Sequence, residues 1–186
     1  IGITNTTVQT EHPLAIDAEY SRLLAVGERL SAAFDSASLR SALATALPVA
    51  GVETAFVSRF VGSSSSELEA FLCLLDGTSI DAASSSFSAG ELLPPHAYPA
   101  DRRSTFIVMP LAFEAQPLGL AGFEYVPGRT GYQVIRDQIA AALKSVALHE
   151  EVVQKSMQHE RSLQERLATA KRLQSLSVLA GGVAHD

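Results

Sequence analysis

Two apolar runs, STFIVMPLAF (Ser104–Phe113) and LGLAGFEYV (Leu118–Val126), are separated by the short segment EAQP (Glu114–Pro117). Such runs separated by a short turn predict a β-hairpin. TAFVSRFV (Thr54–Val61) is typical of a strand because it is rich in β-branched and aromatic residues. LEAFLCLL (Leu68–Leu75) fits a helix or a strand by pattern alone, but its short length between Ser-rich and Asp-Gly turns favours a strand. We therefore expect four strands, of which the last two form a hairpin.

Helices are predicted before these strands. Apolar residues recur at helical spacing between Ile16 and Phe34, and a second helix is expected over Ser38–Leu47. A hydroxyl of Ser36 or Ser38 could cap this second helix by accepting an unpaired backbone N–H. Pro48 is expected to end it.

The segment Asp76–Arg103 differs from the rest of the chain. It contains a serine run and three prolines, Pro94, Pro95 and Pro99, but few periodic apolar positions. We expect a loop-rich crossover, and a long loop in a compact domain is usually functional or mobile. The charged triplet Asp101-Arg102-Arg103 is interpreted as a solvated turn.

A long helix is predicted from Tyr132, because neither proline nor glycine occurs again before Gly181. Fifty helical residues measure roughly 75 Å, too long to be buried against a domain of about 120 residues. Apolar residues recur along it in a heptad pattern that predicts a parallel coiled coil. The pattern comprises Ile139, Val146, Val153, Glu160 and Leu167, with Leu163 and Ala170 as companions. The apolar positions after Ala170 change phase, which locally unwinds or overwinds a coiled coil.

Composition narrows the classes of function. The chain has 186 residues, 47% of them hydrophobic, and a net charge of −6, which disfavours nucleic acid as a partner. No run approaches the roughly 18 apolar residues of a membrane span. Ile1–Thr10 lacks the basic and apolar regions of a signal peptide. Cys73 is the single cysteine, so we expect no internal disulfide, no cysteine-based zinc site and a reducing cytoplasmic location. We also predict no metal site elsewhere.

The order of elements, together with LLPPHAYPADRRSTFIVMPLAFEAQPLGLAGFEY (Leu92–Tyr125), resembles a GAF domain. The segment is similar to a GAF subgroup fused to bacterial kinases, cyclases and transcription regulators. The resemblance implies an α+β fold, with an antiparallel sheet flanked by helices on one face and a ligand pocket on the other. A PAS-like domain, which has a related architecture, is the alternative.

The ligand of such a domain is not predicted by the resemblance. The chain lacks a cyclic-nucleotide motif, and Cys73 does not lie in a chromophore-attachment context. His96, the one histidine of the crossover, is interpreted as a surface residue rather than a haem ligand. A small-molecule pocket would lie between the sheet and the crossover, near Phe56, Phe71, Phe106 and Phe123. The alternative for these four residues is plain core.

The segment RLQSLSVLAGGVAHD (Arg172–Asp186) resembles the phosphoacceptor box of a two-component sensor histidine kinase. The resemblance implies that His185 accepts the γ-phosphoryl group of ATP and passes it to a response regulator. Asp186 would orient the imidazole or act as a base. A neutral imidazole is nucleophilic near its usual pKa of about 6.5, and a neighbouring carboxylate fixes its tautomer. The alternative is an ordinary helix end with a Gly-Gly C-cap.

These features predict the sensor and dimerisation region of a histidine kinase, organised in four parts. We expect an arm at 1–15, a GAF-like sensor domain at 16–133, a coiled-coil signalling helix at 134–172, and the start of the dimerisation and phosphoacceptor domain at 173–186. ATP would be used by a kinase domain that these residues do not include. The predicted partners are a second copy of the chain and a response regulator. A GAF domain that binds no ligand and serves as a dimerisation scaffold is the alternative.

Overall fold

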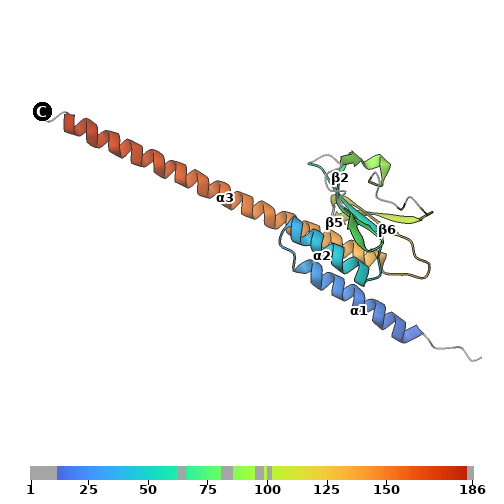
Figure 1. Cartoon of the computed structure of the whole chain (residues 1–186). Coiled ribbons are helices and arrows are strands. Elements are labelled where there is room, and N and C mark those ends of the chain that lie inside the picture. The colour runs from blue at the N-terminus through green and yellow to red at the C-terminus, as the bar shows by residue number, and fades with distance from the viewer. Residues whose placement is uncertain (1–11, 63–65, 81–85, 95–98, 100–101, 184–186) are drawn as a thin grey trace, which may run out of the picture. The chain divides into compact units, whose positions relative to one another are not determined.

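The computed structural model describes residues 12–62, 66–80, 86–94, 99 and 102–183, with side chains described between residues 19 and 172. The fold is α+β, with helices beside a sheet (Figure 1). The sheet has six antiparallel strands in the order β3-β2-β1-β6-β5, with β4 paired to β2. The four predicted strands are confirmed. The strands are β1 (Ala55–Phe60), β2 (Glu67–Leu75), β3 (Thr78–Ile80), β4 (Ser86–Ser88), β5 (Phe106–Phe113) and β6 (Gln116–Glu124).

The predicted hairpin is confirmed, with a shorter turn than expected. Phe113 pairs with Gln116, so only Glu114 and Ala115 lie between β5 and β6. Glu114 has a positive φ of 53°, a conformation that tight turns between antiparallel strands often require. Leu118 is an extra residue in β6, because Leu111 pairs with Gly119 while the next residue of β5 pairs with Pro117. Next to this β-bulge, Gly119 lies close to the backbone of β1.

The crossover contains more regular structure than the sequence predicted. β3 and β4 add two short strands to the sheet beside β2, and η1 (Ala89–Glu91) forms a 3₁₀ turn after β4. Each of these elements has three residues, which is too short to produce a periodic apolar signal. The prediction of a loop-rich crossover therefore missed these three short elements.

α1 (His12–Ser31) and α2 (Ser36–Val49) form the two predicted helices, and Asp35 rather than a serine caps α2. The Asp35 carboxylate accepts from the Ser38 N–H at 2.7 Å, and the Ser38 hydroxyl accepts from the Asp35 N–H at 3.1 Å. This reciprocal pair is a capping box. Pro48 lies in the last turn, and Gly51, with a φ of 80°, ends the helix by reversing the chain.

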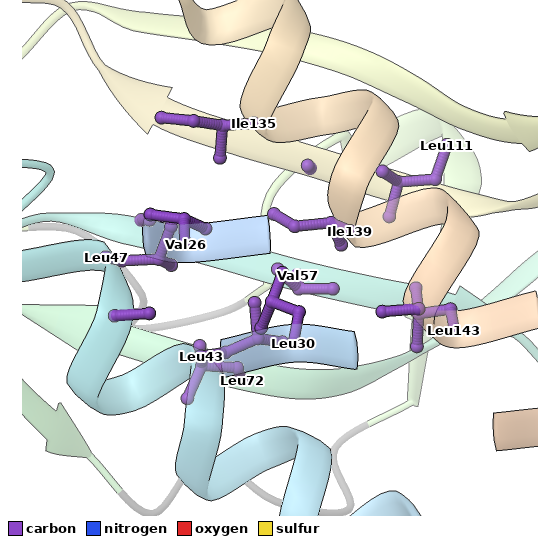
Figure 2. Close-up of a cluster of buried hydrophobic side chains, with 14 of the residues drawn as sticks. Val26, Leu30, Leu43, Leu47, Val57, Leu72, Leu111, Ile135, Ile139 and Leu143 are labelled. Atoms are coloured by element: carbon purple, nitrogen blue, oxygen red, sulfur yellow. The ribbon is translucent and has the colours of Figure 1, made fainter. Parts of the chain in front are cut away.

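The helices gather on one face of the sheet, called here the helix face, and the core lies between (Figures 1 and 2). Side chains from α1, α2, the start of α3 and four strands interlock there. The core includes Val26, Leu30, Leu43, Leu47, Val57, Leu72, Leu111, Ile135 and Ile139, each at most 3% exposed. Their burial removes apolar surface from water and so supplies the main stabilisation of the sheet.

α3 (Tyr132–Val183) is the predicted long helix, but its first turns belong to the core. Ile139 and Val146 are 0% and 3% exposed within their own chain. They cannot at the same time form the seam of a coiled coil with a second copy. The heptad pattern was therefore misread at its first two positions, because a core helix and a coiled-coil helix both repeat apolar residues about every turn.

The chain divides into two compact units, Ile1–Val146 and Ala147–Asp186. The first unit thus extends beyond residue 133, where the sequence placed the end of the sensor domain. In the second unit no residue between Ala147 and Arg172 is buried. Among the described residues, no helix combines the length and the apolar character that crossing a membrane requires.

Candidate functional site

A small apolar cluster lies on the opposite face of the sheet, called here the far face. Phe56, Ala70 and Cys73 form its buried centre, and the partly buried side chains of Ile80, Leu93, Phe106 and Val108 pack against it. The Phe56 and Phe106 rings are tilted, with centroids 5.9 Å apart. The far face is therefore already partly filled by side chains from the strands and from the segment after η1.

The four phenylalanines of the predicted pocket divide between the two faces. Phe56 and Phe106 belong to the far-face cluster, whereas Phe71 and Phe123 belong to the core on the helix face. Successive side chains of a strand point to opposite faces, so residues from four strands share a face only when their positions match. Phe123 contacts Tyr132 of α3, with ring centroids 5.8 Å apart. Within the described residues, the one ring contact between two of the four is that of Phe56 with Phe106.

Phe71 reaches the helix face because of a β-bulge in β2. Val57 pairs with Leu72 and Ser58 pairs with Ala70, so Phe71 is an extra residue without a partner of its own. The guanidinium carbons of Arg40 and Arg59 lie 5.3 Å and 5.5 Å from the centre of its ring. Positive charge near the face of an aromatic ring is favourable. The two arginines therefore help to hold the bulge against α2.

Ser58 places a polar atom within the sheet. Its side chain is 0% exposed, and its hydroxyl has no hydrogen-bond partner among the described residues. Ser58 follows Phe56 by two positions on β1, so strand alternation places it on the far face. Gly122 of β6, which pairs with Phe56, leaves space for the Phe56 ring, because an added Cβ would overlap that ring. The far face thus combines an apolar cluster with one unpaired hydroxyl.

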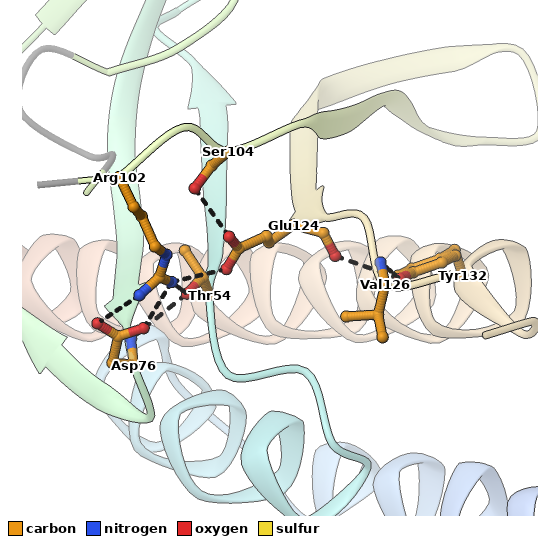
Figure 3. Close-up of polar contacts among 7 residues, drawn as sticks. All are labelled: Thr54, Asp76, Arg102, Ser104, Glu124, Val126 and Tyr132. Atoms are coloured by element: carbon orange, nitrogen blue, oxygen red, sulfur yellow. Dashed lines mark hydrogen bonds and ion pairs between the residues drawn. The ribbon is translucent and has the colours of Figure 1, made fainter. Parts of the chain in front are cut away.

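A polar network closes one end of this face (Figure 3). Arg102 donates to both carboxylate oxygens of Asp76, at 3.2 Å and 2.7 Å, and to a Glu124 oxygen at 3.0 Å. The Ser104 hydroxyl donates to the other Glu124 oxygen at 2.8 Å. Thr54, which is only 2% exposed, lies 3.5 Å from the guanidinium. We call these residues, Thr54, Asp76, Arg102, Ser104 and Glu124, the clasp.

The clasp changes the ionisation of its members. Hydrogen bonds from Arg102 hold the pKa of the Asp76 carboxyl below its usual value. Burial acts to raise the pKa of Glu124, but hydrogen bonds from Ser104 and Arg102 outweigh it and the pKa is lowered. The pKa of Arg102 is raised, first by its bonds to Asp76 and then by those to Glu124. The charged forms of all three groups are therefore favoured in the folded protein.

We expect Arg102→Gln to lower the resistance to urea at neutral pH and to have little effect at low pH. Because the carboxyl pKa values are lowered by folding, their stabilisation is present above the usual pKa of about 4. It is lost as the pH falls through the lowered values of Asp76 and Glu124. Urea unfolding of both proteins at neutral pH and at about pH 3 measures the difference.

Arg103→Gln is the matched control, because Arg103 is also exposed and no ion pair to it occurs within the described ranges. It should leave the urea midpoint unchanged at both pH values. A deficit of Arg102→Gln that stayed constant down to about pH 3 would contradict an ionic role for Arg102.

Sequence reasoning missed the clasp. The triplet Asp101-Arg102-Arg103 was interpreted as a solvated turn, whereas Arg102 pairs with two carboxylates. Its partners lie next to the ends of strands: Thr54 precedes β1, Asp76 follows β2, and Glu124 ends β6. Predicting the clasp from sequence would have required knowing that these strand ends meet at one end of the sheet.

The predicted phosphoacceptor His185 and the predicted orienting residue Asp186 lie outside the described residues, as does His96. α3 continues through both glycines of the Gly181-Gly182 pair and ends at Val183. Within the described ranges, no group of three His, Cys, Asp or Glu side chains could hold a metal ion.

The exposed part of α3 carries large apolar side chains. Val153, Met157, Leu163 and Leu167 are 37%, 55%, 45% and 62% exposed. Val153 and Leu167 occupy positions of the predicted heptad that the core does not use. This part of the helix therefore presents apolar surface at coiled-coil spacing.

No family model and no curated protein matches this sequence. Three features of the chain bear on its function: the far face with its clasp, the exposed apolar positions of α3, and the C-terminal sequence LAGGVAHD.

Proposed function

We propose that the chain is the sensor and dimerisation region of a two-component histidine kinase. In this proposal the first unit is a GAF-like sensor domain, and α3 is a signalling helix that leads to the phosphoacceptor His185. The partners are a second copy of the chain and a response regulator. An α+β domain with helices on one face of an antiparallel sheet supports the sensor assignment.

The observation that carries the proposal is the exposure of apolar residues along α3. From Ala147 to Arg172 the helix buries no side chain in its own chain, yet it carries Val153, Leu163 and Leu167. Long helices that are not covered by their own domain gain stability by pairing an apolar face with another helix. A parallel two-stranded coiled coil would cover these side chains.

The C-terminal sequence supports the chemical part of the proposal. The helix carrying the exposed apolar positions continues to Val183, two positions before His185 in sequence. A ring nitrogen of His185 would attack the γ-phosphorus of ATP held by a kinase domain, and ADP would leave. The Asp186 carboxylate would stabilise the positive charge that develops on the imidazole. The phosphoryl group would then pass to an aspartate of the response regulator.

Signalling would require two states of the helix pair. A ligand or partner of the sensor domain can shift the balance only by binding one state more tightly than the other. Glu160 occupies a heptad position between Val153 and Leu167, where a charged side chain weakens the pairing. The change of apolar phase after Ala170 gives a second place at which the pairing is weak.

We expect Val153→Glu combined with Leu167→Glu to convert a dimer into a monomer. The substitutions place four carboxylates near the seam of a helix pair, where like charges repel and apolar contacts are lost. Multi-angle light scattering over a range of protein concentrations measures the change. The matched control, Gln158→Glu with Ser162→Glu, adds the same charge at heptad positions that face away from the seam.

A chain that ends at Val153 separates this interface from others. If the full chain is a dimer and the shortened chain is a monomer, assembly depends on the helix, as proposed. A shortened chain that remains dimeric would place the main interface in the first unit. A full chain that is monomeric at all concentrations would exclude the two-stranded model.

A sensor-like domain that binds no ligand and serves as a dimerisation scaffold is the second candidate. The contact between Phe56 and Phe106, with Leu93 packed on the same cluster, favours it because these side chains fill space on the far face. A ligand that binds only the folded state raises stability by mass action. A metabolite that raises the melting temperature in a dose-dependent way would therefore exclude the scaffold.

A further inference from the structure

We propose that Arg102 is an ionic latch for the far face, whose release exposes the apolar cluster around Phe56 and Cys73. The guanidinium joins three separate parts of the sheet, because Asp76 follows β2, Glu124 ends β6, and Arg102 itself precedes β5. Thr54, which precedes β1, lies within 3.5 Å of it. One side chain therefore ties together the ends of four strands (Figure 3).

The apolar cluster of the far face lies immediately beside the clasp. Phe56 lies two positions after Thr54, Phe106 two positions after Ser104, and Cys73 three positions before Asp76. Phe106 is paired with Glu124 in the sheet, so the carboxylate bound by Arg102 neighbours the ring that covers Phe56. Loosening the clasp would thus act directly on the strands that hold the cluster closed.

Leu93, which precedes Arg102 in the sequence, also covers the cluster. Leu93 packs against the buried centre formed by Phe56, Ala70 and Cys73. Pro94 and Pro99, which follow it, are buried. Arg102 follows Pro99 by three positions, and its ion pairs to Asp76 and Glu124 attach the chain to the sheet at Arg102.

The latch is weak enough to open, because its charges are accessible to solvent. The side chains of Arg102 and Asp76 are 40% and 56% exposed, whereas that of Glu124 is 22% exposed. Exposed ion pairs are screened by salt and stabilise only modestly. Opening would uncover the cluster and the unpaired hydroxyl of Ser58, whereas the separate core on the helix face would remain packed.

Cys73 reports this opening without any engineered label. It is the single cysteine and is 2% exposed, and burial raises the pKa of its thiol to about 11. A thiol reagent such as dithionitrobenzoate therefore reacts only after the cluster opens. We expect Arg102→Gln to accelerate the labelling of Cys73 roughly fivefold, in line with the modest strength of exposed ion pairs. Cys73 of the Arg103→Gln variant should be labelled at the wild-type rate.

Two further measurements separate local opening from global unfolding. In low urea, the labelling rate of the wild-type protein should rise less steeply than global unfolding predicts, because local opening exposes little surface. Raising the salt concentration to about 0.5 M should accelerate the labelling of Cys73 in the wild-type protein and leave the labelling rate of Arg102→Gln almost unchanged. Glu124→Gln, which removes a carboxylate bound by Arg102, should accelerate the labelling of Cys73 as Arg102→Gln does.

The opposite results would overturn the proposal. Equal labelling rates for the wild-type protein and Arg102→Gln would show that the clasp does not control access to Cys73. Labelling with the full urea dependence of global unfolding would show that the cluster opens only when the whole domain unfolds.

Discussion

Gly119→Ala should cost about 3 kcal/mol or more in the free energy of unfolding, as overpacking against a rigid neighbour does. An alanine Cβ at this position would overlap the Ser58 carbonyl oxygen and lie 2.8 Å from the Arg59 Cα. Both atoms belong to the backbone of β1, which is paired to β2 on its other side and cannot move away. Urea unfolding followed by tyrosine fluorescence measures the effect, because the chain has four tyrosines and no tryptophan.

Gly90→Ala is the control for this substitution. The nearest atom to an added Cβ there is the Ser88 hydroxyl oxygen at 3.6 Å, an ordinary contact, and the φ angle of Gly90 is not positive. It should change stability by less than about 1 kcal/mol. If both alanine variants had the same stability, β6 would not approach β1 as closely at Gly119 as described.

Ile139→Ala should destabilise the first unit by about 2–5 kcal/mol, as expected for deleting most of a fully buried aliphatic side chain. Ile139 is 0% exposed and packs in the core on the helix face, where Figure 2 shows it among Val26, Leu30 and Val57. The cavity would lie where α3 packs on the sheet. The unfolding midpoint in urea, with Tyr132 as the buried probe, measures the loss.

Two valines of the heptad pattern, Val146 and Val153, allow the same substitution to be compared at a buried and at an exposed position. Val146→Ala removes a side chain that is 3% exposed and should cost about 2 kcal/mol. Val153→Ala, seven positions later, removes one that is 37% exposed and should change unfolding of the first unit by less than about 0.5 kcal/mol. Equal losses at the two positions would contradict the boundary between core helix and exposed helix at Val146.

The regular elements could be predicted because each carries a local signal. The hairpin of β5 and β6 has two apolar runs around a short turn, and α3 has no proline and no glycine from Tyr132 to Ala180. β3 and β4 were missed because three residues are too few for a pattern. The α2 cap was assigned to a serine because sequence alone does not distinguish Asp35 as cap from Ser38 as the third helical residue.

The candidate site was harder to predict because it depends on contacts between distant segments. The bulge at Phe71 rotates this residue away from the face of Phe56, and no local pattern announces an extra residue in a strand. Arg102 contacts Asp76, 26 positions earlier, and Glu124, 22 positions later. Likewise, the spacing of Ile139 and Val153 is regular, but only the fold decides which of them is buried.

Tyr132 connects the clasp to the start of α3. Its hydroxyl donates to the Glu124 carbonyl at 3.2 Å and accepts from the Val126 N–H at 3.0 Å, and Tyr132 is the first residue of α3. Glu124 therefore meets Arg102 through its side chain and the start of α3 through its backbone. Thermodynamic reciprocity applies at this residue: if clasp opening shifts Tyr132 by some coupling free energy, then displacing Tyr132 favours clasp opening by the same amount. A change imposed on α3 at Tyr132 would therefore alter the clasp, just as a change in the clasp would alter the start of α3.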